Sequence, residues 1–351
     1  MTRLEERFRR QAEQCAAHGS PLTGALLHGA ADDYVAGGVT RDLLEPYADE
    51  PSGTVVSLRY AGALHRLVLE RKAPELALHY PSVGGTASVN EVWPAAERAT
   101  REHLDELRQL VQNPVQTNEV GRSAALYGAL VMLGGPITLL EIGTSGGLNL
   151  RCDAFAYELE DGTVLGDRGS PVRLHHPWTG RIPIASAPPV LVSRNGCDPA
   201  PVDVATTSGR TTLISYVWAD QVDRLERLRG AMQVAAQVPA EVERSHALPF
   251  LERELAQLPA DITTVVWHSL VWQYVDPVER AAINALFDEA GARATESSRL
   301  ARVSLEPTRI GGGDFTFQVH VQTWPGGERV HVADALGHGP PVRWLGARLN
   351  L

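Results

Sequence analysis

The sequence predicts an α/β protein in which an N-terminal helical domain precedes a mostly parallel β-sheet with a C-terminal antiparallel hairpin. Three observations favour this class. The first third of the chain carries apolar residues three and four apart, which is the spacing of helices. After Pro136, short continuous apolar runs alternate with amphipathic segments, as in parallel sheets covered on both faces. Near the C-terminus, apolar and polar residues alternate singly, which is typical of paired antiparallel strands.

Helices fill the predicted first domain, residues 1–134. They are expected within residues 4–18, 21–38, 55–85 (a helix followed by a loop), 91–112 and 114–133. Gly37 and Gly38 close the second helix, and Pro94 stands in the first turn of the fourth. No flexible linker follows these helices. The change of pattern between Gly134 and Pro136 therefore sets the boundary to the second domain.

Strands and helices alternate in the predicted second domain, residues 135–351. Strands are expected at 137–143, 188–198, 240–246 and 263–272, helices at 220–237, 248–258 and 276–292, and a closing hairpin at 314–336. Ligands of open α/β sheets bind outside the carboxyl ends of the strands. The residues that follow these strands are therefore the first candidates for a functional site.

The composition restricts the partners of the protein. Of its 351 residues 44% are hydrophobic and 21% are charged, as in ordinary globular proteins. The formal net charge of −10 argues against a surface that neutralises nucleic-acid phosphates. Cys15, Cys152 and Cys197 lack metal-ligand spacing and indicate reduced thiols, and the N-terminus has no apolar secretory core. We therefore expect a cytoplasmic protein without a nucleic-acid partner.

One apolar run, residues 124–140, approaches the length of a membrane span. Gly134, Gly135 and Pro136 interrupt it, which favours a buried helix, a break and a buried strand. The histidines show no spacing of the zinc-binding type. We therefore expect neither a membrane partner nor a bound metal.

The segment LLEIGTSGGLNL, residues 139–150, carries the densest chemical signal. It lacks the second glycine of the dinucleotide-binding pattern G-x-G-x-x-G. It does fit G-x-S-x-G, the turn that presents a serine nucleophile. A tight turn without any ligand is the structural alternative.

A serine hydrolase would use Ser145 as nucleophile, with a histidine and an acid converging on it. Asp314 followed by His320, His331 or His338 has the required chain order. An apolar helix precedes the strand, and nothing there indicates a loop for an oxyanion hole. The hydrolase therefore stays an alternative.

A loop that binds S-adenosylmethionine (SAM) accounts for more of the same residues. Glu141 ends the first strand and can accept hydrogen bonds from a ligand. The small residues at 143–147 allow close approach of the backbone, and a helix expected from about Leu148 would direct its N-terminus at the site. Asp198 ends the second strand, where a bidentate acceptor suits the two hydroxyls of a ribose.

The E-x-G-x-S-x-G loop, the G-x-D-x-x-P element at 196–201 and the closing hairpin resemble those of the class I SAM-dependent methyltransferases, over about Pro136 to Leu351. The resemblance implies a Rossmann-like fold with SAM as the cofactor. About 50 residues separate the loop from the second acid, where about 20 are usual, so an inserted hairpin is expected at about 156–188. The cofactor-binding residues that the resemblance implies are Glu141, Gly143, Thr144, Ser145, Gly147, Asp198 and His246.

Two polar groups are predicted to bind a small-molecule substrate. They are Asn118, Glu119 and Arg122 in PVQTNEVGR, and Trp272, Gln273 and Tyr274 in VVWHSLVWQY. His268, at the end of the fourth strand, is the predicted general base. The structural alternatives are a helix cap at Thr117 or Asn118, with Glu119 in the first turn, and a histidine packed against aromatic rings.

Four segments, HYPSVGG, PVQTNEVGR, LEIGTSGGLNLR and VVWHSLVWQY, are together similar to a bacterial domain family of unknown function, over nearly the whole chain. The sequence predicts a SAM-dependent methyltransferase that acts on a small molecule. The alternatives are the serine hydrolase, a non-catalytic nucleotide-binding or scaffold protein with the same fold, and a protein that binds another adenosine ligand.

Overall fold

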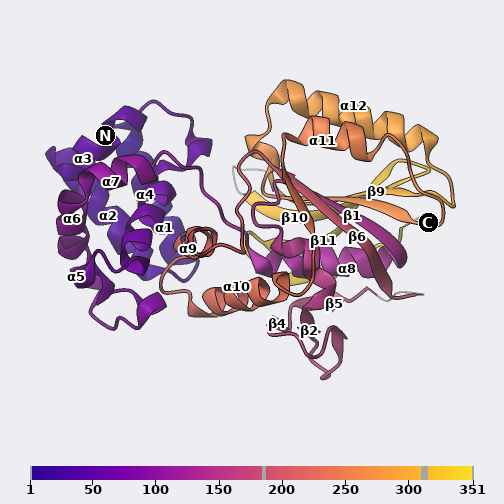
Figure 1. The fold of residues 1–351 in the computed structure, drawn as a ribbon, viewed down its shortest axis with the longest axis horizontal. Coiled ribbons are helices and arrows are strands. Elements are labelled where there is room, and N and C mark those ends of the chain that lie inside the picture. Colours follow the sequence, from indigo (N-terminus) through magenta and orange to yellow (C-terminus); the bar gives the residue numbers. More distant parts are fainter. Residues whose placement is uncertain (1, 184–186, 310–314, 350–351) are drawn as a thin grey trace. The chain divides into compact units, whose positions relative to one another are not determined.

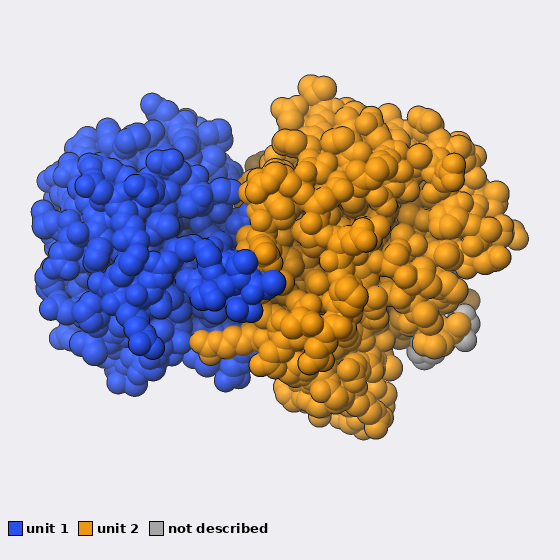
Figure 2. Space-filling model, in the orientation of Figure 1, with its two compact units in different colours: residues 1–117, 205–226 blue, residues 118–204, 227–351 orange. Residues whose placement is uncertain are grey.

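The computed structural model describes residues 2–183, 187–309 and 315–349, and the chain forms two compact units. Unit 1 comprises Met1–Thr117 and Ala205–Glu226, and unit 2 comprises Asn118–Val204 and Arg227–Leu351 (Figure 2). The division thus falls at residue 117, whereas the change of sequence pattern suggested residue 134. The reason is that α8 (Ser123–Leu133) packs against strands of unit 2.

Unit 1 is helical, as the apolar spacing predicts. Its helices are α1 (Arg3–Ala17), α2 (Pro21–Ala36), α3 (Val39–Leu44), α4 (Val56–Leu69), α5 (Pro74–Ala77), α6 (Val92–Glu102), α7 (Leu104–Leu110) and α9 (Thr207–Ser215), with 3-10 turns η1 (Glu45–Tyr47), η2 (Ser52–Thr54), η3 (Pro81–Val83) and η4 (Val89–Glu91). Thr2 and Glu5 cap the start of α1 reciprocally, in a capping box. Apolar faces of these helices meet in one buried cluster that contains Phe8, Leu27 and Leu64.

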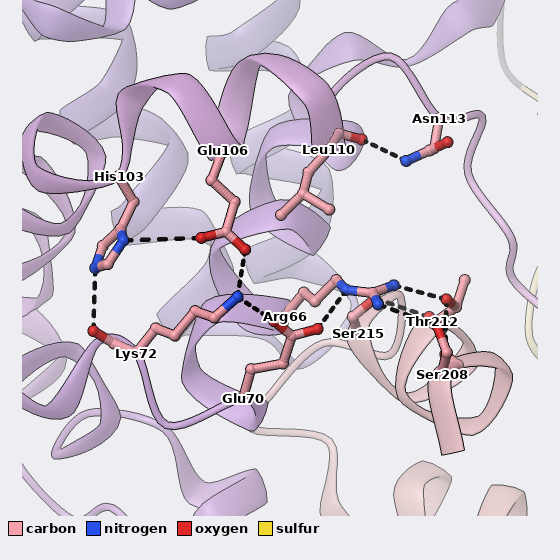
Figure 3. Close-up of polar contacts among 10 residues, drawn as sticks. All are labelled: Arg66, Glu70, Lys72, His103, Glu106, Leu110, Asn113, Ser208, Thr212 and Ser215. Atoms are coloured by element: carbon pink, nitrogen blue, oxygen red, sulfur yellow. Dashed lines mark hydrogen bonds and ion pairs between the residues drawn. The ribbon is translucent and has the colours of Figure 1, made fainter. Parts of the chain in front are cut away.

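The second segment of unit 1 is held by polar contacts to the first. Arg66 of α4 donates to the hydroxyls of Thr212 (2.9 Å) and Ser208 (3.2 Å) in α9, while Glu70 pairs with Arg66 (Figure 3). Asp220 accepts from the backbone amide of Leu22 at 2.9 Å, at the first turn of α2. Residues 205–226 therefore complete the helical unit although they follow strands of unit 2 in the chain.

Unit 2 contains one large sheet. Its strands are β1 (Gly135–Ile142), β5 (Trp178–Arg181), β6 (Pro189–Asp198), β7 (Glu241–Arg244), β8 (Thr263–Ser269), β9 (Leu300–Arg309), β10 (Phe315–Trp324), β11 (Glu328–Leu336) and β12 (Gly339–Leu345). Their order is β5-β12-β11-β10-β9-β8-β1-β6-β7. In this order, β9, β8, β1, β6 and β7 run parallel to one another. The strands β9, β10, β11 and β12 pair antiparallel. The mostly parallel sheet and the antiparallel C-terminal strands confirm that the protein is of the mixed α/β class.

Helices cover both faces of this sheet. Figure 1 shows α11 (Ala247–Glu254) and α12 (Pro277–Arg293) over one face and α8 over the other. Leu140 and Ile142 of β1 pack with Phe250 of α11 and Phe287 of α12 in one buried cluster. The helix α10 (Val222–Ala235) spans the last division between the units. In the described residues no helix is both long and apolar enough to cross a membrane, and the apolar run at 124–140 divides between α8 and β1.

The predicted insertion at about 156–188 is larger than one hairpin. β2 (Ala156–Glu158) and β3 (Val164–Gly166) do pair antiparallel, and β4 (Arg173–His175) adds a third strand beside β2. β5, however, leaves this small sheet and pairs with β12 at the edge of the large one. The insertion is anchored because Tyr127 of α8 stacks on Tyr157 with ring centroids 4.6 Å apart.

Candidate functional site

The strand order reverses between β1 and β8. From β1 the chain proceeds to β6 and β7 on one side, and from β8 it proceeds to β9 on the other. In open α/β sheets, such a switch point opens a crevice outside the carboxyl ends of the two strands. Glu141, the last residue but one of β1, lies next to Trp267 of β8, and His268 follows Trp267. The chemical motifs of the sequence therefore converge at the edge where ligands bind in this kind of sheet.

The loop after β1 is held tightly to the neighbouring strand. The amides of Gly143 and Thr144 both donate to the carbonyl of Cys197 at the end of β6, at 2.9 and 3.1 Å. Gly143 has φ +69°, and a Cβ there would lie 2.3 Å from Cγ2 of Val271. Only glycine satisfies both the left-handed backbone and this close approach. The glycine spacing thus reflects a loop pressed against the segment that follows β8.

Glu141 is buried, with 3% of its surface exposed. Burial raises the pKa of its carboxyl group to about 8, although a hydrogen bond from the Thr144 hydroxyl and the charge of Arg122 oppose this shift. The Thr144 hydroxyl donates to Oε2 at 2.6 Å. Near neutral pH the carboxyl group can therefore hold or release a proton at the switch point.

Asp198 lies beside the same loop and already holds two backbone amides. Its Oδ2 accepts from Ser145 N at 2.9 Å, and its Oδ1 accepts from Ala200 N at 2.8 Å. The residue is 8% exposed. A carboxylate has about four acceptor positions, so capacity for ligand hydroxyls remains. Asp198 consequently ties the end of β6 to the loop, which the sequence did not predict.

Ser145 has a left-handed backbone with φ +52°, a conformation in which residues other than glycine are uncommon. Of the predicted hydrolase partners, His320 and His331 face each other on β10 and β11, with ring centroids 5.2 Å apart. His338 lies with its Nδ1 3.7 Å from Oε2 of Glu119. Asp314 lies outside the described residues. In these contacts the histidines pair with each other and with Glu119, not with Ser145.

The helix expected from about Leu148 is a 3-10 helix, η6 (Leu148–Ala154), with a kink at Arg151. The Leu148 amide, which would point to a ligand in the predicted arrangement, donates to Oδ1 of Asn118 at 3.0 Å. Arg151 donates to the carbonyl of Gly147 at 2.7 Å. The prediction of a helix N-terminus at the site was thus wrong in detail, because a side chain from a distant segment takes the amide.

The segment 118–122 is brought against the loop. Asn149 donates to the carbonyl of Glu119 at 3.2 Å, beside the contact made by Asn118. Glu119 caps the 3-10 turn η5 (Val120–Arg122) by accepting from Gly121 N at 3.0 Å, so the cap is neither Thr117 nor Asn118. Arg122 donates to the carbonyl of Gly337 at 2.9 Å. These predicted substrate residues are buried in unit 2 and bind the protein itself.

His268 has both ring nitrogens engaged. Its Nδ1 lies 2.8 Å from Oε1 of Glu306, and Nε of Arg302 donates to its Nε2 at 3.1 Å. An arginine can only donate, so Nε2 accepts and Nδ1 carries the proton. Burial lowers the pKa of His268, which favours the neutral ring. The predicted general base therefore has no lone pair for a substrate in this arrangement.

The three predicted substrate residues after β8 differ in their exposure. Trp272 of η7 (Trp272–Tyr274) stacks on His268 at 5.0 Å and lies 4.5 Å from the Arg302 guanidinium, while Gln273 and Tyr274 are exposed. His246 is also exposed, after β7. Sequence reasoning missed Arg302 and Glu306. The signal in the sequence was that Arg302 and Glu306 are charged and four residues apart, and therefore lie on the same side of the largely apolar strand β9.

The fold and the site define a mixed α/β protein with a polar, glycine-rich loop at the switch point of its sheet. Residues 5–344 match the model of the family described as "Uncharacterized protein conserved in bacteria (DUF2332)", and the chain belongs to this family. The match confirms the similarity to a bacterial family of unknown function that the four segments indicated. No curated protein and no solved structure matches the chain.

Proposed function

We propose that unit 2 binds SAM in a Rossmann-like manner and transfers its methyl group to a small molecule. The observation that carries the proposal is the convergence of Glu141, the loop from Gly143 to Gly147 and Asp198 at the switch point between β1 and β8. Adenosine ligands are bound at such points of open α/β sheets. The strand order β7-β6-β1-β8-β9 supports the same idea, because it places the two acids on adjacent parallel strands.

The residues present suit such a ligand. Two buried carboxyl groups can accept hydrogen bonds from ribose hydroxyls or an ammonium group. Oδ1 of Asn149, two residues after the loop, is buried and has no hydrogen-bond partner among the residues described, so a donor from a ligand would satisfy it. The three cysteines are unpaired and buried, in keeping with the reducing cytoplasm that we propose as its location.

In the proposed methyl transfer, the side chains of the protein have few chemical roles. The sulfonium of SAM supplies an activated methyl group, so side chains mainly position the reactants. Glu141 holds a proton at Oε1 or Oε2 with a pKa of about 8, which is suitable for exchanging it with a bound ligand. His268 acts as a positioning residue in this proposal, because Glu306 and Arg302 occupy its nitrogens.

The test is calorimetric titration of the full chain with SAM and with its demethylated product, S-adenosylhomocysteine. We expect both to bind, and Asp198→Ala to weaken binding about tenfold to a hundredfold, since a hydrogen bond to a charged acceptor contributes roughly 1.5–3 kcal/mol. Asp288→Ala, at an exposed position on α12, is the matched control. Absence of binding by both ligands would refute the proposal. Binding of ATP or adenosine alone would favour another adenosine ligand.

The serine hydrolase is the second candidate because of the left-handed backbone of Ser145, since nucleophile turns are strained in this way. Ser145→Ala should leave SAM affinity within a few fold, because alanine is small enough for the turn. Loss of an esterase activity in Ser145→Ala, with no SAM binding in the parent protein, would favour the hydrolase instead.

A further inference from the structure

The segment HYPSVGG of unit 1 plays no part in the proposed methyl transfer. Its serine, Ser82, lies in the 3-10 turn η3, which is capped at its C-terminal end by Gly84 with φ +87°. The next residue, Gly85, has no room for a side chain, because a Cβ would lie 2.3 Å from the carbonyl oxygen of Ala77. The turn therefore fixes the position of Ser82 closely.

The hydroxyl of Ser82 is paired with a histidine. Oγ of Ser82 lies 2.8 Å from Nε2 of His65 in α4. The other nitrogen of this ring, Nδ1, lies 3.2 Å from the backbone carbonyl oxygen of Ser215 in α9. A carbonyl oxygen can only accept a hydrogen bond, so Nδ1 carries a proton. In the neutral ring Nε2 is then an acceptor, and the Ser82 hydroxyl donates to it.

This is the arrangement of an activated serine. A nucleophilic serine needs a base within hydrogen-bond reach, and the base needs a third group that fixes its tautomer. Here the carbonyl of Ser215 has the orienting role that a carboxylate has in a Ser-His-Asp triad. The ring of Tyr80 packs against His65 with centroids 5.3 Å apart and restricts its rotation. Both residues are buried, with His65 2% exposed and Ser82 9% exposed.

We propose that Ser82 and His65 form an acyl-transfer site that accepts small esters. Oγ of Ser82 would attack the carbonyl carbon while its proton passes to Nε2 of His65. The ester C–O bond then breaks, and the leaving alcohol takes that proton. Water attacks the acyl-serine in the same way, which releases the carboxylic acid and restores the hydroxyl. The low exposure of Ser82 favours slender acyl groups.

The experiment is labelling of the full chain with a small alkyl fluorophosphonate, followed by mass mapping of the modified peptide. Labelling forms an Oγ–P bond at Ser82 and expels fluoride, while the serine proton passes to His65. We expect modification at Ser82. Absence of modification at Ser82 after prolonged exposure to millimolar probe would overturn the proposal. Modification at Ser145 alone would overturn it as well.

The decisive variant is His65→Asn. The asparagine amide can still donate to the Ser215 carbonyl, but it offers no base to Ser82. General-base assistance contributes typically 10²–10⁴-fold, so the labelling rate should fall at least about a hundredfold in the folded variant. Labelling at the rate of the parent protein would show that His65 is only a structural tether. Ser88→Ala, at a neighbouring turn, is the matched serine control and should label normally. If His65→Asn unfolds, mass mapping of the parent protein still decides, since absence of modification at Ser82 contradicts the proposal.

Discussion

Replacing Glu141 with glutamine should change how the stability of the protein depends on pH. The carboxyl group has an ordinary pKa of 4.5, and burial raises the pKa in the folded protein to about 8. The native state therefore binds this proton more tightly than the unfolded chain does. Proton binding at Glu141 therefore stabilises the folded protein fully below about pH 4.5, and this stabilisation is lost as the pH rises through about 8.

The magnitude follows from proton linkage. Between these two pKa values the folded protein holds about one more proton at this site, so its free energy of unfolding falls by about 1.4 kcal/mol per pH unit. From pH 5.5 to 7.5 the loss is thus roughly 2 to 3 kcal/mol. Glu141→Gln keeps an acceptor for the Thr144 hydroxyl and does not titrate. The free energy of unfolding of the variant should therefore not show this fall with pH.

The assay is urea unfolding of both proteins at pH steps from 5 to 8. The difference in unfolding free energy between Glu141→Gln and the parent protein should increase by roughly 2 to 3 kcal/mol in favour of the variant between pH 5.5 and 7.5. Glu289→Gln is the matched control, because that side chain on α12 is 75% exposed. Parallel pH profiles for the parent protein and Glu141→Gln would refute the assignment of a raised pKa to this group.

Three further predictions concern the same unit. Gly143→Ala should destabilise the protein by more than about 2 kcal/mol in urea unfolding, whereas Gly135→Ala, which has a similar positive φ but no described residue within 4 Å of its Cβ position, should cost clearly less; equal losses would contradict the packing argument. Asn118→Ala removes the acceptor for the first amide of η6 and should cost about 1 kcal/mol, with no loss expected if that contact is absent in solution. Trp272→Leu should lower the melting temperature more than Trp272→Phe, because only the leucine abolishes the stacking of Arg302, worth about 1–2 kcal/mol; the reverse order would disprove it.

The parallel strands were predictable because their signal is local. The runs that became β1 and β8 are continuous and apolar, and buried parallel strands have this pattern. The glycine loop could also be placed, since a left-handed turn after a strand needs residues such as Gly143. That Asp198 lies near the loop followed from the expectation that both strands end at one edge.

The contacts that changed the interpretation of the site are non-local. His268 is engaged by Glu306 and Arg302, which lie on a different strand, and no spacing in the sequence reveals that β9 pairs with β8. Likewise, a polar segment before a helix indicates a cap, but it does not show that Asn118 reaches the loop at Leu148. The boundary at residue 117 could not be predicted for a similar reason. The apolar sequence of α8 indicates that the helix is buried, but it does not indicate which of the two units it packs against.

Because unit 1 is built from two separate segments, the nascent chain cannot complete it early in synthesis. Protein synthesis proceeds from the N-terminus, and domains generally fold as units during synthesis. Unit 1 cannot be completed until the ribosome has added residue 226, and by then the whole of β1 to β6 has been made. Until that moment α2 lacks the carboxylate of Asp220, and Arg66 lacks its partners in α9. The N-terminal helices therefore stay incompletely packed during synthesis, until the segment that begins about ninety residues after Thr117 has been made.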